Sequence, residues 1–353
     1  MNRKRWILII LFIIIVIVSA GLFYYYNVLL QSGEIEVLDQ AGRTIHVPRN
    51  VDKIISLWPE ATRVIIALGC GDKLVGVDSN EKRDPVMTQI YPQLKQLPDV
   101  GSLRTGVNIE QVISLKPSVI FADAMMPETA DSIQEQTRIP VVCVRISLPP
   151  DGHFSFELIT IIGKILQKSD RADYIRSFLE NKLSKVTDVT SEIPKNERIT
   201  GYVAFARDPL TTLGHVDPLV SAGVINVAAK GFKSIWYAVN IEQLITWNPE
   251  IIIVHCLHER IGNYTIEMLR NDPQWQQIRA VQMGKVYNVI IGYYGCYPAF
   301  SVINVMQIAK IAYPERFKSL DIEAEGNNIY KALYDIDDFF SGIAQEFNLF
   351  IPK

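Results

Sequence analysis

The sequence predicts an α/β protein of two lobes, each with a central, mostly parallel sheet flanked by helices, joined by one long helix. Short apolar runs alternate with helical segments in two separate parts of the chain, and this alternation is typical of parallel sheets covered by helices. One segment also occurs twice, as NIEQVISLKPSVIFAD at 108–123 and NIEQLITWNPEIIIVH at 240–255. A chain of 353 residues leaves room for two compact units of about 130 to 150 residues.

The N-terminus differs from the rest of the chain. Residues 6–26 carry no charge and follow a tail, residues 1–5, that contains three basic residues. At about 1.5 Å per residue a helix of this length spans the hydrocarbon core of a bilayer. The basic tail predicts that it stays in the cytoplasm and that the chain after the helix lies outside. Cleavage of a signal sequence after Ala20 is the alternative, and it would release a secreted or periplasmic protein.

The N-terminal lobe is predicted to span residues 34–150. It opens with a hairpin at 34–47, because apolar and polar residues alternate around an Ala-Gly-Arg turn. Apolar strands then alternate with helices whose ends are marked by Pro or Gly. The further elements are predicted at 53–58 (strand), 60–68 (helix), 74–77 (strand), 108–115 (helix), 118–122 (strand), 128–136 (helix) and 141–146 (strand).

A helical linker is predicted at 151–195, with a long helix from about 169 to 189 that follows a break at 168–170. The C-terminal lobe, 196–320, repeats the alternation of strands and helices, and residues 321–353 form a helical tail. The elements of this lobe are predicted at 199–206 (strand), 218–222 (helix), 240–247 (helix), 250–255 (strand), 264–269 (helix) and 285–291 (strand).

The repeated segment is a helix, a turn and a buried strand, used once in each lobe. The helix runs to Pro117 in the first copy and to Pro249 in the second, where the chain turns into the strand. An Asn N-cap followed by an acid in the first turn is ordinary helix chemistry. Similar structural needs in two similar lobes therefore remain one explanation of the repeat.

Charge and motifs exclude several functions. Of the 35 basic residues three lie in the tail, which leaves 32 against 38 acidic residues and a net charge of −6 outside it, and this excludes a typical nucleic-acid binder. No catalytic motif is present, whether GxSxG, HExxH or a phosphate loop. The four cysteines show no CxxC spacing, so they form disulfides in one of three pairings or remain free thiols: Cys70, Cys143, Cys256 and Cys296.

From about residue 34 to 317 the chain resembles the substrate-binding proteins of ABC importers for iron complexes, haem and cobalamin. The resemblance rests on stretches that occur in the family's order, including VLDQAGRTIHVP, KIISLWPEATRVIIALGCGDKLVGV, DVGSLRTGVNIEQVISLKPSVIFA, IIGKILQKSDRADYI, WYAVNIEQLITWNPEIIIV and DPQWQQIRAVQMGKVYNV. It implies a receptor and not an enzyme, and a rigid backbone helix that limits closure of the lobes. We expect a monomer.

The resemblance also assigns a role to one glutamate in each copy of the repeat. In this family each lobe carries a surface glutamate that docks on arginines of the membrane permease, and the matching residues here are Glu110 and Glu242. Two carboxylates, each in a charge-assisted pair with an Arg, fix the orientation of a receptor as well as adding affinity. The expected partner is therefore an ABC permease dimer.

Ligands of α/β lobes lie beyond the carboxyl ends of the parallel strands. Aromatic side chains there suit large flat ligands, and Arg suits anionic oxygen groups. The residue set that follows from this rule is Trp58, Arg104, Met125, Arg145, Arg207, His215, Trp236, Tyr237, Tyr293 and Tyr294. The resemblance implies that the transported ligand is an iron–siderophore complex, haem or cobalamin, and that the protein has no cofactor of its own.

His255 and His258 follow a buried strand and are the most metal-like pair in the chain. An imidazole facing the ligand is an axial ligand for haem iron or corrin cobalt, although loop or core histidines are the alternative. The resemblance adds further axial candidates: His215, Met125, Met126 and Tyr293. Two other functions stay open, namely an anchored ligand sensor without a transporter and a chelatase-like metal enzyme.

Overall fold

The computed structural model describes residues 13, 16–19, 21, 33–146, 154–229, 236–255, 259–292 and 295–352, without the side chains of residues 236 and 259–263. The predicted anchor at 6–26 lies almost wholly outside this part, and its described residues are helical. Within the described ranges, no helix is both long and apolar enough to cross a membrane.

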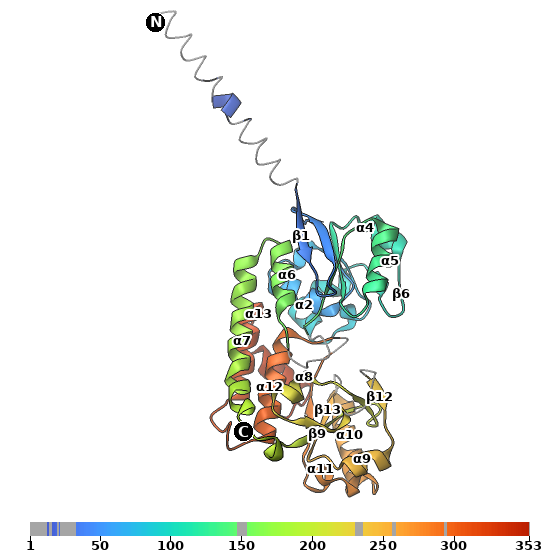
Figure 1. Ribbon diagram of the computed structural model, residues 1–353, viewed down its shortest axis with the longest axis vertical. Helices are drawn as coiled ribbons and strands as arrows, with labels where there is room; N and C mark the ends of the chain where they lie inside the picture. The colour runs from blue at the N-terminus through green and yellow to red at the C-terminus, as the bar shows by residue number, and fades with distance from the viewer. Residues whose placement is uncertain are drawn as a thin grey trace, which may run out of the picture.

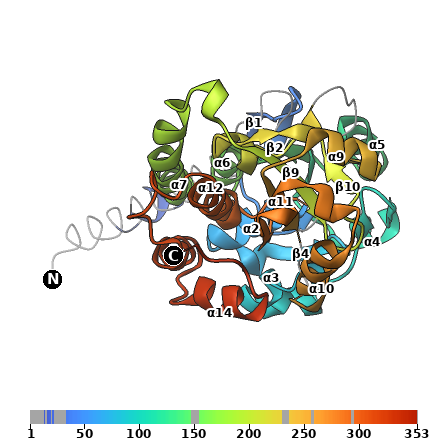
Figure 2. The same cartoon turned by 90° about the horizontal axis from the view of Figure 1, so that it is seen from below.

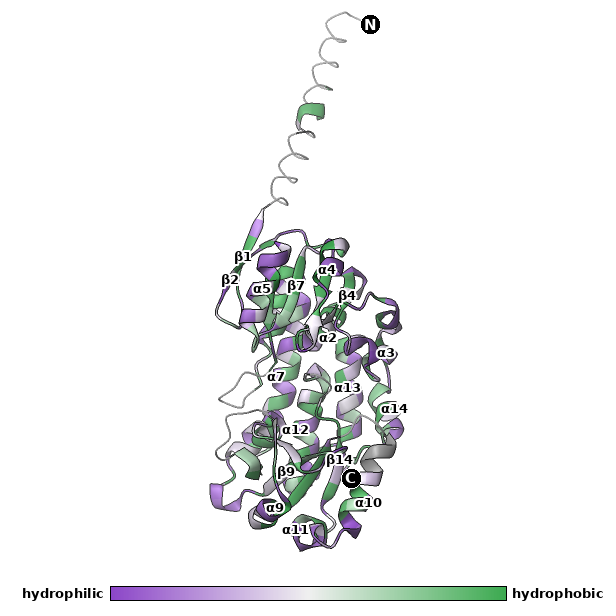
Figure 3. Ribbon diagram, turned by 90° about the vertical axis from the view of Figure 1, so that its right-hand side faces the viewer, coloured by the Kyte–Doolittle hydropathy of each residue, from purple (hydrophilic) through white to green (hydrophobic). Residues whose placement is uncertain are grey.

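The N-terminal lobe, drawn in blue to green in Figure 1, is built on a four-stranded parallel sheet in the order β4-β3-β7-β8. Every residue of β7 is buried, as expected for a strand covered on both faces, and Figure 3 colours this strand as hydrophobic. The sheet strands are β3 (Ile54–Ser56), β4 (Leu74–Val77), β7 (Val119–Asp123) and β8 (Val141–Val144). The helices are α2 (Pro59–Ala67), α3 (Met87–Ile90), α4 (Ile109–Leu115) and α5 (Pro127–Thr137).

The C-terminal lobe repeats this architecture with a parallel sheet in the order β11-β9-β13-β14. Its strands are β9 (Thr200–Phe205), β11 (Ile225–Asn226), β13 (Ile251–His255) and β14 (Val286–Val289). Its helices are α8 (Asp217–Ser221), α9 (Ile241–Trp247), α10 (Glu259–Asn271) and α11 (Arg279–Gln282). Both predicted parallel sheets are thereby confirmed.

Small antiparallel pairs complete the lobes. The predicted N-terminal hairpin is present, with Val37 opposite Ile45. The paired strands are β1 (Glu34–Leu38) with β2 (Thr44–Pro48), β5 (Gly101–Ser102) with β6 (Gly106–Val107), and β10 (Thr211–Leu213) with β12 (Trp236–Ala238). Short 3-10 turns lie at Gly71–Lys73, Glu81–Arg83, Pro92–Gln96, Lys195–Glu197, Val227–Ala229 and Trp275–Gln277.

A layer of helices runs along one side of both lobes (Figure 1). The predicted long helix is α7, which has 23 residues and packs against α6, α12 and α13. A Cβ atom at Gly163 would lie 2.3 Å from Cβ of Ala172, so α6 and α7 meet at a distance that only glycine allows. The helices of this layer and the tail are α6 (Glu157–Ile165), α7 (Ser169–Ser191), α12 (Pro298–Ala312), α13 (Ile322–Tyr334) and α14 (Phe339–Glu346).

One hydrophobic core extends through both lobes and the helical layer. It includes Val37 of the hairpin, Val142 of the first sheet, Ile253 of the second sheet and Leu349 near the C-terminus. Two smaller cores fill the remaining faces of the two sheets. The lobes therefore share buried apolar surface, the main favourable term in folding.

Candidate functional site

The ligand-facing edge predicted for the N-terminal lobe brings three residues together. Trp58 follows β3, Asp123 ends β7 and Arg145 follows β8, and these strands are neighbours in the sheet. Nη1 of Arg145 donates to both carboxylate oxygens of Asp123, at 2.8 and 2.9 Å, and the guanidinium carbon lies 5.1 Å from the ring centroid of Trp58. Trp58 and Arg145, which the strand-end rule selects, thus lie in one cluster in the structure.

The N-terminal hairpin holds Arg145 from behind. The side-chain amide of Gln40 accepts from the backbone N–H of Arg145 at 2.7 Å and donates to its carbonyl at 2.9 Å. Burial opposes the charged form of Arg145, but the carboxylates of Glu60 and Asp123 outweigh it and raise the pKa of the guanidinium. Arg145 is therefore a charge that its own lobe already balances, and not a free cation.

Glu60, in the first turn of α2, is fully buried and joins the two lobes. One carboxylate oxygen accepts from the backbone N–H of Ile146 at 2.6 Å. The other accepts from the backbone N–H of Cys296, in the segment that follows β14, at 2.7 Å. Burial raises the pKa of Glu60, while Arg145 and these two N–H groups oppose the rise.

Arg63 lies one turn further along α2 and is also fully buried. Its Nη2 donates to Glu81 at 3.1 Å and to Asp84 at 2.9 Å. Its Nη1 donates to the carbonyls of Gly295 and Cys296, at 3.2 and 3.0 Å. The sequence predictions missed both Glu60 and Arg63, although two opposite charges inside the apolar helix PEATRVIIA are a signal that buried partners exist.

Tyr297 completes this interlobe network. Its ring centroid lies 4.0 Å from the guanidinium carbon of Arg63, and its hydroxyl donates to Asp84 at 2.9 Å. Burial raises the pKa of Glu81 to about 8, with Arg63 opposing and Asp84 reinforcing the rise. The carboxyl groups of Glu81 and Asp84 thus share one guanidinium in a site that is buried from bulk solvent.

His215 is a predicted ligand residue of the C-terminal lobe. It hydrogen-bonds Asp217 at the start of α8, and this bond raises the pKa of the imidazole. The charge of Arg145 acts in the opposite sense on the pKa of His215.

The other predicted ligand residues differ in exposure and in their partners. Arg104 and Arg207 are exposed, Met125 is 40% exposed while Met126 is partly buried, and the hydroxyl of Tyr237 donates to the carbonyl of Ala228. Trp236 is described only as a residue of β12, paired with Leu213. Tyr293, Tyr294 and His258 lie outside the described residues.

His255 ends β13 and packs edge-on against Phe205, with ring centroids 5.2 Å apart. Its Nδ1 accepts from the backbone N–H of Ile291 at 3.1 Å, and burial lowers the pKa of the imidazole to about 4. A neutral imidazole is the form that binds metals, but Nδ1 of His255 already accepts the hydrogen bond from Ile291. Across the described ranges, no group of three or more His, Cys, Asp or Glu side chains is arranged to hold a metal ion.

Glu110 and Glu242 are both exposed. Asn108 accepts from the backbone N–H of Gln111 at 3.1 Å, and Asn240 accepts from that of Gln243 at 2.8 Å. Helix capping therefore accounts for the repeated Asn, but among the described residues neither glutamate side chain forms a hydrogen bond or ion pair that would account for its repetition. Figures 1 and 2 both show α4 and α9 on the side of the molecule away from α7.

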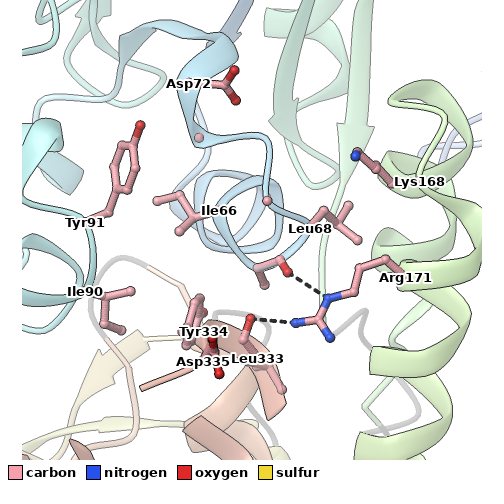
Figure 4. A pocket seen from close by; sticks show the side chains of 13 residues that line it. Ile66, Leu68, Asp72, Ile90, Tyr91, Lys168, Arg171, Leu333, Tyr334 and Asp335 are labelled. Atoms are coloured by element: carbon pink, nitrogen blue, oxygen red, sulfur yellow. Dashed lines mark hydrogen bonds between the residues drawn. The ribbon is translucent and has the colours of Figure 1, made fainter. Parts of the chain in front are cut away.

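A pocket of about 620 Å³ lies at the opposite end of α2, against α7 and α13 (Figure 4). Arg171 forms part of its wall and donates to the carbonyl of Ala67 at 3.3 Å and to those of Ala332 and Leu333 at 2.7 and 3.0 Å. Unbonded carbonyls end every helix. Arg171 satisfies one carbonyl at the end of α2 and two at the end of α13, so its role here is to join these helix ends.

Three of the four cysteines are free thiols. Cys70 and Cys143 are buried and Cys296 is partly buried. Burial raises the pKa of all three thiols, which keeps them protonated and unreactive. Cys256 lies outside the described residues.

Comparison with known proteins shows the same two-lobed fold and the family. Residues 54–289, more than half of the chain, match a family described as periplasmic binding protein, and the chain belongs to this family. The family consists of solute receptors and not enzymes. The chain is accordingly an extracytoplasmic substrate-binding protein of an ABC importer. Proteins of this kind bind a small ligand and interact with an ABC permease.

Three relatives illustrate the range of the family. The molybdate-binding protein MolA of Haemophilus influenzae is 26% identical over 331 residues, which cover 84% of this chain and 90% of MolA. An uncharacterized ABC transporter substrate-binding lipoprotein, YvrC of Bacillus subtilis, is 24% identical over 289 residues, which cover 80% of this chain and 87% of YvrC. A vitamin B12-binding protein of Yersinia pestis is 25% identical over 217 residues, 60% of this chain and 72% of that protein.

The structure of MolA bound to molybdate has the same fold. Its TM-score is 0.73 at 23% identity, and the match covers 86% of this chain and 98% of that chain.

Proposed function

We propose that this protein captures a metal chelate between its two lobes, an iron–siderophore complex, haem or cobalamin, and delivers it to an ABC permease. The observation that carries the proposal is the cluster of Trp58, Asp123 and Arg145 at the strand ends of one lobe, against which Gly295 of the other lobe packs. This cluster combines an aromatic face with hydrogen-bonding groups of both signs. Such a surface suits a large ligand with mixed polar and apolar parts.

Charge balance favours a chelate over a bare anion. Asp123 and Glu60 accompany Arg145, and Asp217 accompanies His215. A small dianion needs uncompensated positive charge or several donors, because its loss of hydration is expensive. A chelate whose ligand groups already balance the metal makes a smaller demand on the site.

A molybdate-type oxyanion is the second candidate. The observation that favours it is the similarity to MolA, which extends over 331 residues. Arg145 would then act as an oxyanion donor through its remaining N–H groups.

The experiment that tests the proposal is purification of the full chain from its native host, followed by an absorption spectrum and a mass spectrum. A Soret band, a corrin spectrum or a siderophore mass supports the chelate. Titration calorimetry with a ferric trihydroxamate, haem, cyanocobalamin and molybdate then gives the affinities. Binding of molybdate alone would replace the chelate by the oxyanion.

We also propose that the permease docks on Glu110 and Glu242. Their exposure, their matched places on α4 and α9, and the position of both helices away from α7 support this. Ligand uptake by variants of the two glutamates measures it. Failure of the protein to bind any permease would favour an anchored ligand sensor.

We propose further that residues 6–26 hold the protein, as a monomer, at the outer face of the cytoplasmic membrane. The uncharged run and the basic tail before it support this arrangement. Release of the protein from membranes by an alkaline wash would contradict it.

A further inference from the structure

We propose that Glu60 is a positioning residue of the ligand site. Its single carboxylate holds one ligand-facing segment of each lobe and so fixes the two segments relative to each other. The inference rests on the proposed function in one respect, that the strand-end edge is where the ligand lies. It adds a residue that the strand-end rule does not select, because Glu60 is buried inside the first turn of α2.

The geometry gives one carboxylate oxygen to each lobe. One oxygen accepts from the N–H of Ile146, the residue directly after Arg145, at 2.6 Å. The other accepts from the N–H of Cys296, beyond the last strand of the second sheet, at 2.7 Å. These partners are 86 and 236 residues away from Glu60 in the sequence. No local helix requirement explains such a pair of bonds.

Close packing reinforces the bond to the C-terminal segment. Gly295 has φ +114°, a conformation that favours glycine. A Cβ atom there would lie 2.9 Å from Cγ of Glu60 and 3.2 Å from Cζ2 of Trp58. The backbone at Gly295 thus rests directly on Glu60 and on a residue of the ligand-facing cluster.

A buried carboxylate is costly, so its presence needs a reason. Two N–H donors and the positive end of α2 offset part of the cost, and Arg145 also lowers the pKa that burial raises. An amide has the same shape but only one accepting oxygen, so its NH₂ group would face an N–H donor. Glutamine at this position can therefore hold one lobe's segment but not both.

Glu81 provides a matched control. It is a second fully buried carboxylate of the same network, but its partner is Arg63 in its own lobe. An amide at position 81 can still accept from Arg63. Glu60→Gln and Glu81→Gln therefore make the same chemical change at equal burial, and only the first removes a contact to a ligand-facing segment.

The test uses the full chain with three measurements on Glu60→Gln and Glu81→Gln. Hydrogen exchange followed by mass spectrometry reports the backbone N–H groups of Ile146 and Cys296 without any ligand. Titration with a ferric trihydroxamate, haem, cyanocobalamin and molybdate reports affinity, and thermal unfolding reports stability. We expect Glu60→Gln to speed exchange in at least one of the two segments and to weaken binding of whichever probe the native protein takes by about tenfold or more.

Glu81→Gln should leave exchange at both segments and the affinity close to native, even where it lowers the unfolding temperature as much. Equal affinities for Glu60→Gln and the native protein, or unchanged exchange at both segments, would overturn the inference. Should none of the probes bind the native chain, the proposed function fails, and the exchange data still decide the positioning role. If Glu60→Gln does not fold, Glu60→Asp, which keeps both acceptors on a shorter side chain, carries the same expectation.

Discussion

Buried charges at the lobe junction show how single residues acquire roles that the local sequence does not display. Arg63 has no exposed surface, yet it meets two carboxylates, two carbonyls and an aromatic ring. Each of these contacts removes part of the cost of burying a guanidinium. The junction is therefore polar inside and still closely packed.

Glu81 gives this junction a measurable dependence on pH. Its pKa in the folded protein is about 8, against an ordinary 4.5. Between about pH 4.5 and about pH 8 the folded protein therefore keeps a proton on Glu81 that the unfolded chain has lost. The stability from this group is therefore present at low pH and is lost as the pH rises toward and through about 8.

We expect the free energy of unfolding of the native protein to fall between about pH 5 and about pH 9 relative to that of Glu81→Gln, which cannot titrate. Urea unfolding at both pH values measures the difference. The comparison isolates Glu81, because His255, whose lowered pKa has the opposite effect, is present in both proteins. Parallel pH profiles for the two proteins would show that Glu81 is not protonated in the fold.

The residue scale also shows why the site was only partly predictable. Arg145 and Trp58 follow strands that are visible as apolar runs, so the strand-end rule selects both. Glu60 could not be found in this way, because its partners lie 86 and 236 residues away. Which backbone groups meet a buried carboxylate depends on packing of the whole chain, which no local pattern records.

At the scale of elements, the repeated helices α4 and α9 separate structural from functional needs. The Asn at the start of each helix caps a backbone N–H group. A left-handed residue ends each helix, Lys116 with φ 50° and Asn248 with φ 45°. Both features serve the turn into the following strand, so the exposed glutamates are the part of the repeat that these structural needs do not explain.

We expect Glu110→Ala combined with Glu242→Ala to abolish uptake of the ligand while leaving ligand affinity and stability near native values. Exposed carboxylates contribute at most about 1 kcal/mol to stability, whereas the proposed docking on a permease uses both. Uptake in cells and titration of the purified protein measure the two quantities.

Two controls accompany this double variant. Glu128→Ala with Glu267→Ala removes two other exposed acids, one from each lobe, and should leave uptake unchanged. Asn108→Ala with Asn240→Ala should cost about 1 kcal/mol of stability for each cap, again with uptake preserved wherever the protein stays folded. Uptake by the double glutamate variant at the native rate would contradict the docking proposal.

Elements with a strong pattern were predicted and elements without one were not. The alternating strands and α7 were recognisable from their periodicity. The helix α12 was missed because Pro298–Lys310 is buried on every side, which leaves no polar stripe to mark a helix. β5 and β6 have two residues each, too few for any alternation to appear.

At the scale of the whole molecule, the two lobes behave as parts of one body. A single core joins residues of both sheets with α7, α12 and α13, and the network around Arg63 adds polar contacts at the junction. Proteins of several domains commonly unfold in separate steps. Here the shared core opposes such separation.

We expect the described body to unfold in one cooperative transition, seen by calorimetry. Arg63→Met leaves Glu81 and Asp84 without their shared cation and should lower stability by about 3 to 5 kcal/mol. Arg270→Met, which alters an exposed arginine, should change stability by less than about 0.5 kcal/mol. Two well-separated transitions in the native protein would show that the lobes fold independently.

The shared core also bears on how such receptors change their ligands over evolution. A hybrid with one lobe from a relative would have to match buried side chains such as Val142 and Ile253 within one interior. It would also have to keep the two backbone partners of Glu60 in place. The lobes are therefore not interchangeable, and we expect new ligand preferences to arise by substitution at the strand ends of an intact scaffold.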